Sequence, residues 1–189
     1  ERHFVDAAET GDLIRMPQKF DRAHGMYFVS CSGLHFSDVT LLTAPGFGVV
    51  DLAGTGSVYE RFRIVPGPTP PGARQPRLFS SMFDGLHGKA GRHGPEIRDC
   101  EFSYTGDDAI AWYMPPLLVL EATEPGQAVL ALQNDITTCR AGDRLRFPLV
   151  DGAETLEVTV ASARFRAGDG ERLAGEVRRL VPEAQGQAF

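Results

Sequence analysis

The chain has 189 residues and a mass of 20.6 kDa; 42% of its residues are hydrophobic and 23% are charged. This size fits one domain or two small ones, and the composition excludes a disordered tail or a collagen-like fibre. Lys and Arg number 19 against 25 Asp and Glu, a net charge of −6, so the basic footprint of a nucleic-acid binder is missing. No apolar run approaches the ~20 residues that span a bilayer. We therefore expect neither a nucleic acid nor a membrane as partner.

The cysteines and the start of the chain restrict the protein's chemistry further. The sequence has an odd number of cysteines at irregular spacings: Cys31, Cys100 and Cys139. This pattern matches neither a zinc site nor a disulfide framework. We expect mostly buried thiols, no metal and no cofactor. The chain begins at Glu1 without a methionine, and without the basic start and apolar stretch of a signal peptide. We expect a piece of a longer protein.

Short strands dominate the expected secondary structure. The chain contains 21 Gly and 13 Pro, and no segment has the apolar spacing of an amphipathic helix. Apolar or alternating segments bounded by turn-forming residues are typical of strands. These segments, in chain order, are 26–29, 34–42, 48–52, 58–65, 97–104, 109–113, 117–122, 128–132, 144–147 and 156–165. The sequence predicts an all-β protein.

Part of the chain repeats itself. Three segments share one spacing of apolar residues: 34–41, 57–64 and 95–102. When the first segment is aligned with the second, Phe36 pairs with Tyr59 and Leu41 pairs with Ile64. A second strand follows each copy, and the proline-rich segment 66–72 interrupts the second repeat as a loop. This periodicity predicts a right-handed parallel β-helix of few coils, although such similarity also arises by chance in β-rich chains.

The repeat pattern divides the chain into three expected parts. Residues 1–25 form a strand segment leading into the solenoid, and residues 26–114 form its coils and carry an acidic site. Beyond Pro115 the pattern stops, and residues 115–189 are expected to form a small antiparallel β-barrel-like module. Unpaired strand edges at the ends of the solenoid leave self-association open as an alternative.

Three aspartates are the candidate catalytic residues. Asp84 and Asp108 occupy the same position on successive coils, ~4.8 Å apart as neighbouring strands are, and Asp107 lies beside them. Neighbouring carboxylates disfavour simultaneous ionisation, which keeps a carboxylic acid available near neutral pH. Two carboxylates astride a glycosidic bond are the usual means of its hydrolysis. Two alternatives stay open: aspartates that merely build turns, and a calcium site.

Two nearby side chains are candidate substrate-binding residues, each with a plainer alternative. His87 follows Asp84 on the same strand and is expected to contact a sugar hydroxyl or to tune the acid; a hydrogen-bonded structural histidine is the alternative. Trp112 follows the acid pair and is expected to stack on a sugar ring; packing explains it equally well. Phe47 takes the position of the aspartates one coil earlier. The following charged residues are expected to form a solvated ladder: Glu60, Arg61, Arg63, Arg98, Asp99 and Glu101.

The motifs Phe-Asp-Gly-Leu-His at 83–87 and Gly-Asp-Asp-Ala-Ile at 106–110 resemble those of the pectin-lyase-like β-helix enzymes. They look most like glycoside hydrolase family 110, the exo-acting α-1,3-galactosidases, and less like the polygalacturonases. The resemblance implies a secreted or periplasmic, inverting, metal-free hydrolase of terminal α-linked galactose or a related sugar. It makes Asp84, Asp107 and Asp108 the catalytic carboxylates. The chain departs from the family pattern at 111–114, so the alternative is a non-catalytic carbohydrate-binding or scaffold β-helix.

Overall fold

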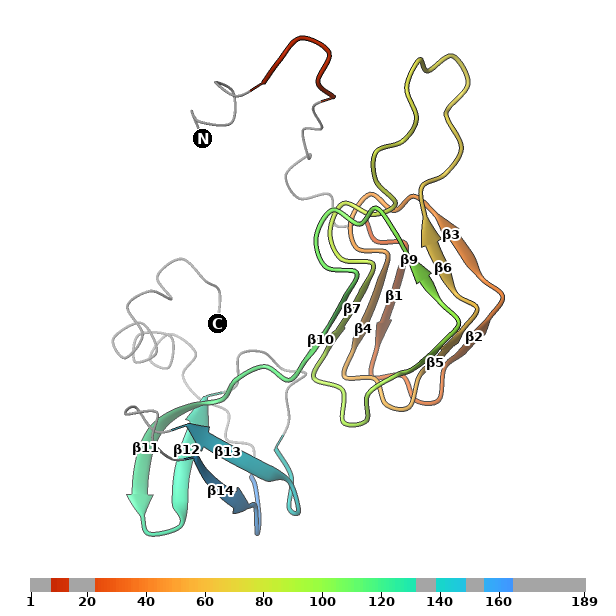
Figure 1. The fold of residues 1–189 in the computed structure, drawn as a ribbon. Helices are drawn as coiled ribbons and strands as arrows, with labels where there is room; N and C mark the ends of the chain where they lie inside the picture. Colours follow the sequence, from red (N-terminus) through yellow and green to blue (C-terminus); the bar gives the residue numbers. More distant parts are fainter. Residues whose placement is uncertain (1–7, 14–22, 132–138, 149–154, 165–189) are drawn as a thin grey trace. The chain divides into compact units, whose positions relative to one another are not determined.

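The computed structural model describes residues 8–13, 23–131, 139–148 and 155–164 (Figure 1). These residues form fourteen strands and no helix, which confirms the predicted all-β class. Within these segments, no helix has the length and apolar character that a membrane crossing requires. The chain divides into two units between Trp112 and Tyr113, where the sequence placed the boundary between 114 and 115. Most of the expected strand segment at 1–25 lies outside the described residues.

Strands β1 to β10 form three parallel sheets (Figure 1). One sheet contains β1 (Met26–Val29), β4 (Val49–Leu52), β7 (Leu86–Lys89) and β10 (Ile110–Tyr113). The second contains β2 (His35–Ser37), β5 (Val58–Glu60) and β8 (Glu96–Arg98), and the third contains β3 (Thr40–Leu42), β6 (Arg63–Val65) and β9 (Glu101–Phe102). The chain visits the three sheets in turn, three times over. The predicted pairings of Phe36 with Tyr59 and of Leu41 with Ile64 are confirmed.

The corners between sheets repeat as the strands do. The predicted strands 34–42, 58–65 and 97–104 were wrong in extent, because each is two strands meeting at a corner. The corner residues Asp38, Arg61 and Asp99 have φ of 58°, 48° and 52°. A positive φ turns the chain sharply and is uncommon outside glycine. Since none of these residues is glycine, the sequence does not reveal the corner.

The core lies between the three sheets. Its fully buried members come from β4, β5, β6, β7 and a corner: Val49, Tyr59, Phe62, Ile64 and Leu86. The Phe36 ring stacks on Tyr59 with centroids 5.4 Å apart, and Phe62 meets Tyr59 edge-on at 5.5 Å. Aromatic pairs of this kind contribute about 0.5–1.5 kcal/mol beyond the area they bury. The repeat therefore holds together through columns of like residues.

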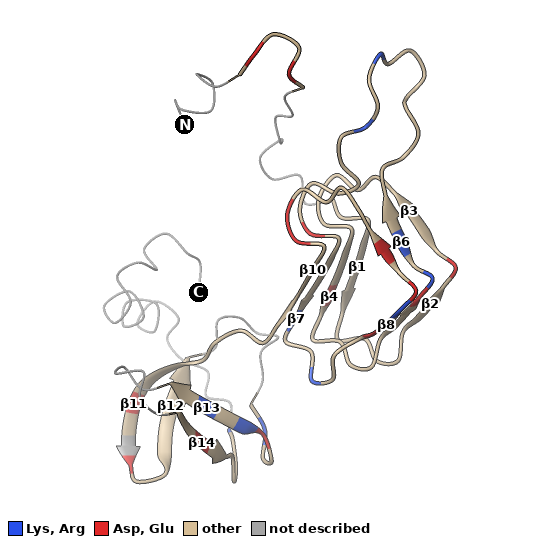
Figure 2. Ribbon diagram, viewed as in Figure 1, with Lys and Arg blue, Asp and Glu red and all other residues tan. Residues whose placement is uncertain are grey.

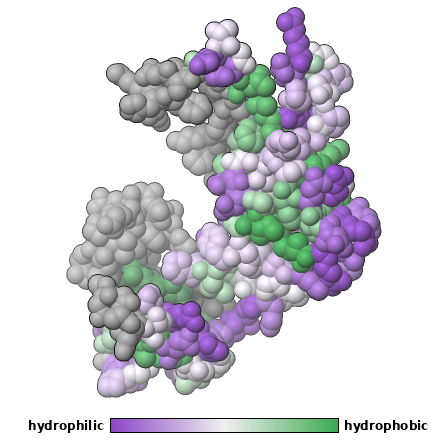
Figure 3. Space-filling view, viewed as in Figure 1, coloured by the Kyte–Doolittle hydropathy of each residue, from purple (hydrophilic) through white to green (hydrophobic). Residues whose placement is uncertain are grey.

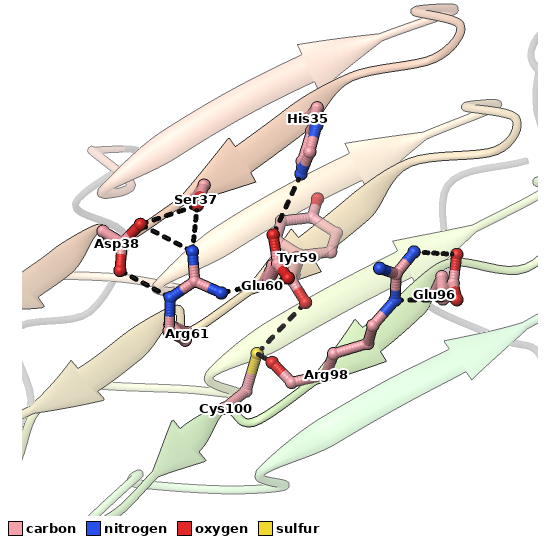
Figure 4. Close-up of polar contacts among 9 residues, drawn as sticks. All are labelled: His35, Ser37, Asp38, Tyr59, Glu60, Arg61, Glu96, Arg98 and Cys100. Atoms are coloured by element: carbon pink, nitrogen blue, oxygen red, sulfur yellow. Dashed lines mark hydrogen bonds and ion pairs between the residues drawn. The ribbon is translucent and has the colours of Figure 1, made fainter.

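The outward side chains of these sheets form ion pairs (Figure 4). Arg61 bonds Asp38 at 2.6 Å, and Arg63 bonds Glu101 at 2.7 Å, one repeat away in each case. Arg98 pairs with Glu96, a residue that the predicted ladder of charges did not include. Figure 3 shows strongly hydrophilic surface on this side of the unit, and Figure 2 shows both signs of charge there. Because these pairs are about half exposed, each contributes little to stability.

The second unit contains two antiparallel hairpins in its described segments. Strands β11 (Leu118–Glu124) and β12 (Gln127–Ala131) form one, and β13 (Arg144–Pro148) and β14 (Thr155–Thr159) form the other. The antiparallel pairing agrees with the sequence, but the predicted barrel-like module needs correction. The described strands make two separate two-stranded sheets and no closed barrel. Closure requires every strand to be hydrogen-bonded on both sides, and these strands are paired on one side only.

A candidate carboxylate site at the turns into β7 and β10

The site lies where the chain enters the first sheet. The residues two positions before β1, β4, β7 and β10 stack across the repeats: His24, Phe47, Asp84 and Asp108. The backbone N–H of Gly48 donates to the carbonyl of Asp84 at 2.9 Å, and that of Gly85 donates to Asp108 at 2.9 Å. These hydrogen bonds give Asp84 and Asp108 equivalent positions in adjacent repeats. The spacing of the two motifs in the sequence indicated the same alignment.

A glycine follows each of the first three stacked residues for a steric reason. A Cβ added to Gly48 would lie 2.5 Å from the carbonyl oxygen of Gly85, and one added to Gly85 would lie 2.7 Å from that of Ala109. The backbones of adjacent repeats approach too closely there for a side chain. The glycine of the Asp-Gly motif thus sets the spacing that brings the aspartates together.

The three predicted aspartates form one cluster. A carboxylate oxygen from each of Asp84, Asp107 and Asp108 lies within 4.8 Å of the others. Asp84 is buried, with 5% of its surface exposed, and the other two are exposed. Figure 2 shows acidic residues on the turns leading into the sheet. Two oxygens this close can both bond a single water molecule, since such bonds are about 2.7–2.8 Å long. The calcium alternative stays open, because calcium takes 6–8 oxygens and carboxylates bind it through one or both of theirs, with water completing the set.

His87 belongs to this cluster. Its Nδ1 lies 2.6 Å from Oδ2 of Asp84, and both side chains are largely buried. With the proton on Nδ1, the ring donates to the carboxylate and both groups are held in one orientation. This contact fits a functional histidine that orients the Asp84 carboxylate. It equally fits the plainer alternative of a hydrogen-bonded histidine.

Trp112 is partly buried and packs against the core instead. Its indole packs against Gly88 and Gly91, where an added Cβ would meet the ring, and against the buried residues of the core. These contacts support the packing interpretation of Trp112. The sugar-stacking interpretation gains no contact from them, and we assign this side chain to the fold.

Aromatic side chains extend from the cluster; of these, the sequence analysis singled out Phe47 by its position, but not its ring neighbours. The ring of Phe47 lies 4.5 Å from His87, 5.1 Å from Phe83 and 5.3 Å from His24, and His24 stacks on Tyr27 at 5.5 Å. The Phe47 N–H donates to Nδ1 of His24 at 3.3 Å. Burial, and then the charge of His87, lower the pKa of His24. The signal in the sequence was position: His24 precedes Gly25 as Asp84 precedes Gly85.

Asp51 is a second titratable group that the sequence analysis passed over. It lies in β4 with no exposed surface. Its Oδ2 accepts hydrogen bonds from the hydroxyls of Ser57 at 2.7 Å and Tyr59 at 3.4 Å. Burial and the neighbouring Asp51 raise the pKa of Tyr59, so the phenol remains a donor. A charged residue between apolar neighbours in a strand was the available signal.

Comparisons with known proteins add nothing to this geometry: no family model, no curated protein and no solved structure matches the chain. The likeness to glycoside hydrolases therefore rests on the two motifs alone. The function has to be argued from the cluster.

Proposed function

We propose that this protein is a glycoside hydrolase built on the coils of a right-handed parallel β-helix. Three parallel sheets visited in turn by β1 to β9 support the β-helix. Repeated corners at Asp38, Arg61 and Asp99 support it as well, because a solenoid turns at the same place in every coil. Adjacent coils then supply the acids from two neighbouring turns.

The single observation that carries the hydrolase proposal is the cluster of Asp84, Asp107 and Asp108. One carboxylic acid gives its proton to the glycosidic oxygen, and the bond from that oxygen to the anomeric carbon breaks with its electron pair on the oxygen. A water held between the other two carboxylates gives its oxygen to the anomeric carbon and its proton to a carboxylate. His87 orients Asp84 through the 2.6 Å hydrogen bond and acts as a positioning residue.

The stereochemistry follows from which group attacks. Inverting enzymes generally hold their two carboxyl groups about 6.5–9.5 Å apart, and retaining enzymes about 5–5.5 Å apart. Here one oxygen of each carboxylate lies within 4.8 Å of the others, which is below the whole range typical of inverting enzymes. Inversion also results, however, when two close carboxylates jointly hold the attacking water and the third carboxyl acts as the acid. We propose inversion on this ground and on the family resemblance. The anomer first released decides between the two routes.

The substrate we propose is a terminal α-linked galactoside or a related sugar. On this proposal the protein acts outside the cell or in the periplasm. The motifs at 83–87 and 106–110 support it. The second candidate is a carbohydrate-binding β-helix without catalysis. It is favoured by the departure from the family pattern at 111–114, where Trp112 packs against the core.

The test is an NMR time course of α-galactosyl disaccharide hydrolysis by the full chain and by Asp108→Asn. We expect the inverted anomer to appear first, and the substitution to lower kcat by about 10²–10⁴-fold, as loss of an acid or base does. Asp99→Asn is the matched control, because Asp99 is an exposed aspartate on a corner away from the cluster. Equal turnover by the two variants would end the catalytic assignment.

Failure to release any sugar has a separate meaning. If the folded protein binds the disaccharide without cleaving it, the carbohydrate-binding alternative holds. If it neither cleaves nor binds the disaccharide, both candidates are wrong.

A further inference from the structure

Aromatic rings form a continuous row on the outer surface beside the aspartate cluster. We define the aromatic row as His24, Tyr27, Phe47, Phe83 and His87. Each ring is within 4.5–5.5 Å of its neighbour, centroid to centroid. The row begins on β7, beside the acids, and ends on β1, two repeats away. It therefore joins the cluster to a surface that the proposed chemistry does not use.

The rings lie over the outer face of the first sheet. Val50 is the register partner of both Tyr27 and His87, and it is 3% exposed although its neighbour Val49 points into the core. Since alternate residues of a strand point to opposite faces, side chains on the outside must cover Val50. Tyr27 is nevertheless 54% exposed and Phe83 37% exposed. The row thus offers ring surface to solvent on this side of the sheet.

The shape of the row selects its ligand. Rings that recognise a quaternary ammonium group surround it as a cage, whereas here His24 stacks on Tyr27 at 14° and the rings around Phe47 are tilted by 39–46° along the row. A flat, extended ligand with apolar ring faces fits such a row. The pyranose rings of a saccharide have these faces, and their hydroxyls are donors for the carboxylates at the end of the row.

We infer that the aromatic row is a saccharide-binding platform that holds the sugar residues adjoining the scissile bond. This inference rests on the proposed function, because the aspartates define where the platform ends. Two repeat steps of ~4.8 Å make the row roughly 10 Å long, which is longer than one pyranose ring. Phe47 is next to the acids and contacts the sugar nearest the cleaved bond. Tyr27 is at the far end and contacts the next sugar along.

The test measures binding, so it does not depend on turnover. Saturation-transfer NMR titrations use the Asp108→Asn protein with methyl α-galactoside and an α-galactosyl trisaccharide. We expect Tyr27→Ala to weaken trisaccharide binding about 3- to 10-fold and to leave the methyl galactoside unchanged, as loss of one stacked ring implies. Phe47→Leu, which keeps an apolar side chain in place, is expected to weaken both. Tyr104→Ala is the control, since Tyr104 is exposed and outside the row.

The outcomes separate this inference from the proposed function. Variants of the row that bind the trisaccharide as tightly as the Tyr104→Ala control overturn the platform, even if Asp108→Asn abolishes hydrolysis. Loss of binding in the Tyr27 and Phe47 variants of a protein that hydrolyses nothing supports the platform and removes the hydrolase. Absence of any saccharide binding by the folded parent overturns the platform.

Discussion

At the scale of single residues, the most consequential side chain outside the site is Asp51. A carboxylate without exposed surface is costly unless hydrogen bonds replace its lost water. Ser57 and Tyr59 supply such bonds to Oδ2, while Oδ1 has no partner within the described part of the chain. Gly54 packs directly against this carboxylate. The two hydroxyl donors therefore stabilise Asp51 in the core.

Removal of the stronger donor tests this account. We expect Ser57→Ala to lower the free energy of unfolding by roughly 1.5–3 kcal/mol, the value of a hydrogen bond to a charged group. The measurement is urea unfolding followed by circular dichroism. Ser37→Ala is the control, since the Ser37 hydroxyl also bonds an aspartate, Asp38, but in an exposed place. Equal stability of the two variants would show that the Ser57 bond contributes no more than a surface contact.

At the scale of the elements, the close approach of adjacent repeats decides which residues fit. Gly25, Gly48 and Gly85 each lie against the backbone of the next repeat, and Gly88 lies against the Trp112 ring. Ala109 takes the equivalent position before β10, which is the edge strand of its sheet. The motif Asp-Gly therefore combines two requirements: a carboxylate for the proposed chemistry and a glycine for packing.

Adding a methyl group at Gly85 tests the packing requirement while the Asp84 carboxylate stays in the sequence. We expect Gly85→Ala to destabilise the fold by about 1–3 kcal/mol, the usual cost of overpacking. It should also impair hydrolysis, because the turn of Asp108 must move away from Asp84. Gly94→Ala is the matched control, as nothing lies within 4 Å of a Cβ there. Thermal unfolding and initial rates of both variants check this, and a Gly85→Ala protein as stable and active as Gly94→Ala would contradict it.

At the scale of the whole molecule, ionisable groups make stability depend on pH in two windows. Burial lowers the pKa of His24 below its ordinary value of 6.5. As the pH falls, His24 is therefore protonated in the unfolded chain before it is protonated in the folded protein. The stability that is present above pH 6.5 decreases as the pH falls below 6.5. The arginine partners of Asp38, Glu96 and Glu157 hold the pKa of those carboxyls below their ordinary values. Their contribution is present above about pH 4 and decreases as the pH falls further.

Denaturation midpoints between pH 8 and pH 2 check both windows. We expect the His24→Gln variant to lose the decrease that begins near pH 6.5 and to retain the one below pH 4. Salt at 1 M should weaken only the pH dependence below about pH 4. The carboxyls responsible are exposed, and the screening length at 1 M salt is about 3 Å. Identical profiles for the parent and the His24→Gln variant would show that His24 is not the group responsible.

Much of the repeat and of the cluster was readable from the sequence for a simple reason. Parallel strands in register place equivalent positions of successive repeats next to one another. The same kind of spacing therefore pairs Phe36 with Tyr59 and aligns Asp84 with Asp108. The corners were not readable, because residues such as Arg61 adopt a positive φ without being glycine. The role of Trp112 was also undecided, since an aromatic residue fits a core and a sugar site equally well.

The sequence by itself determined the all-β class, the parallel register of the first unit and the identity of the three acids, because these follow from local periodicity. Only the tertiary structure decided what surrounds the acids. It brought His87 onto Asp84, aligned His24 and Phe47 along one surface, buried Asp51 under Ser57 and left the second unit as two open hairpins. None of these follows from the strand periodicity: His87 is only three residues from Asp84 and Ser57 six from Asp51, but the turns of the folded chain decide whether such side chains meet.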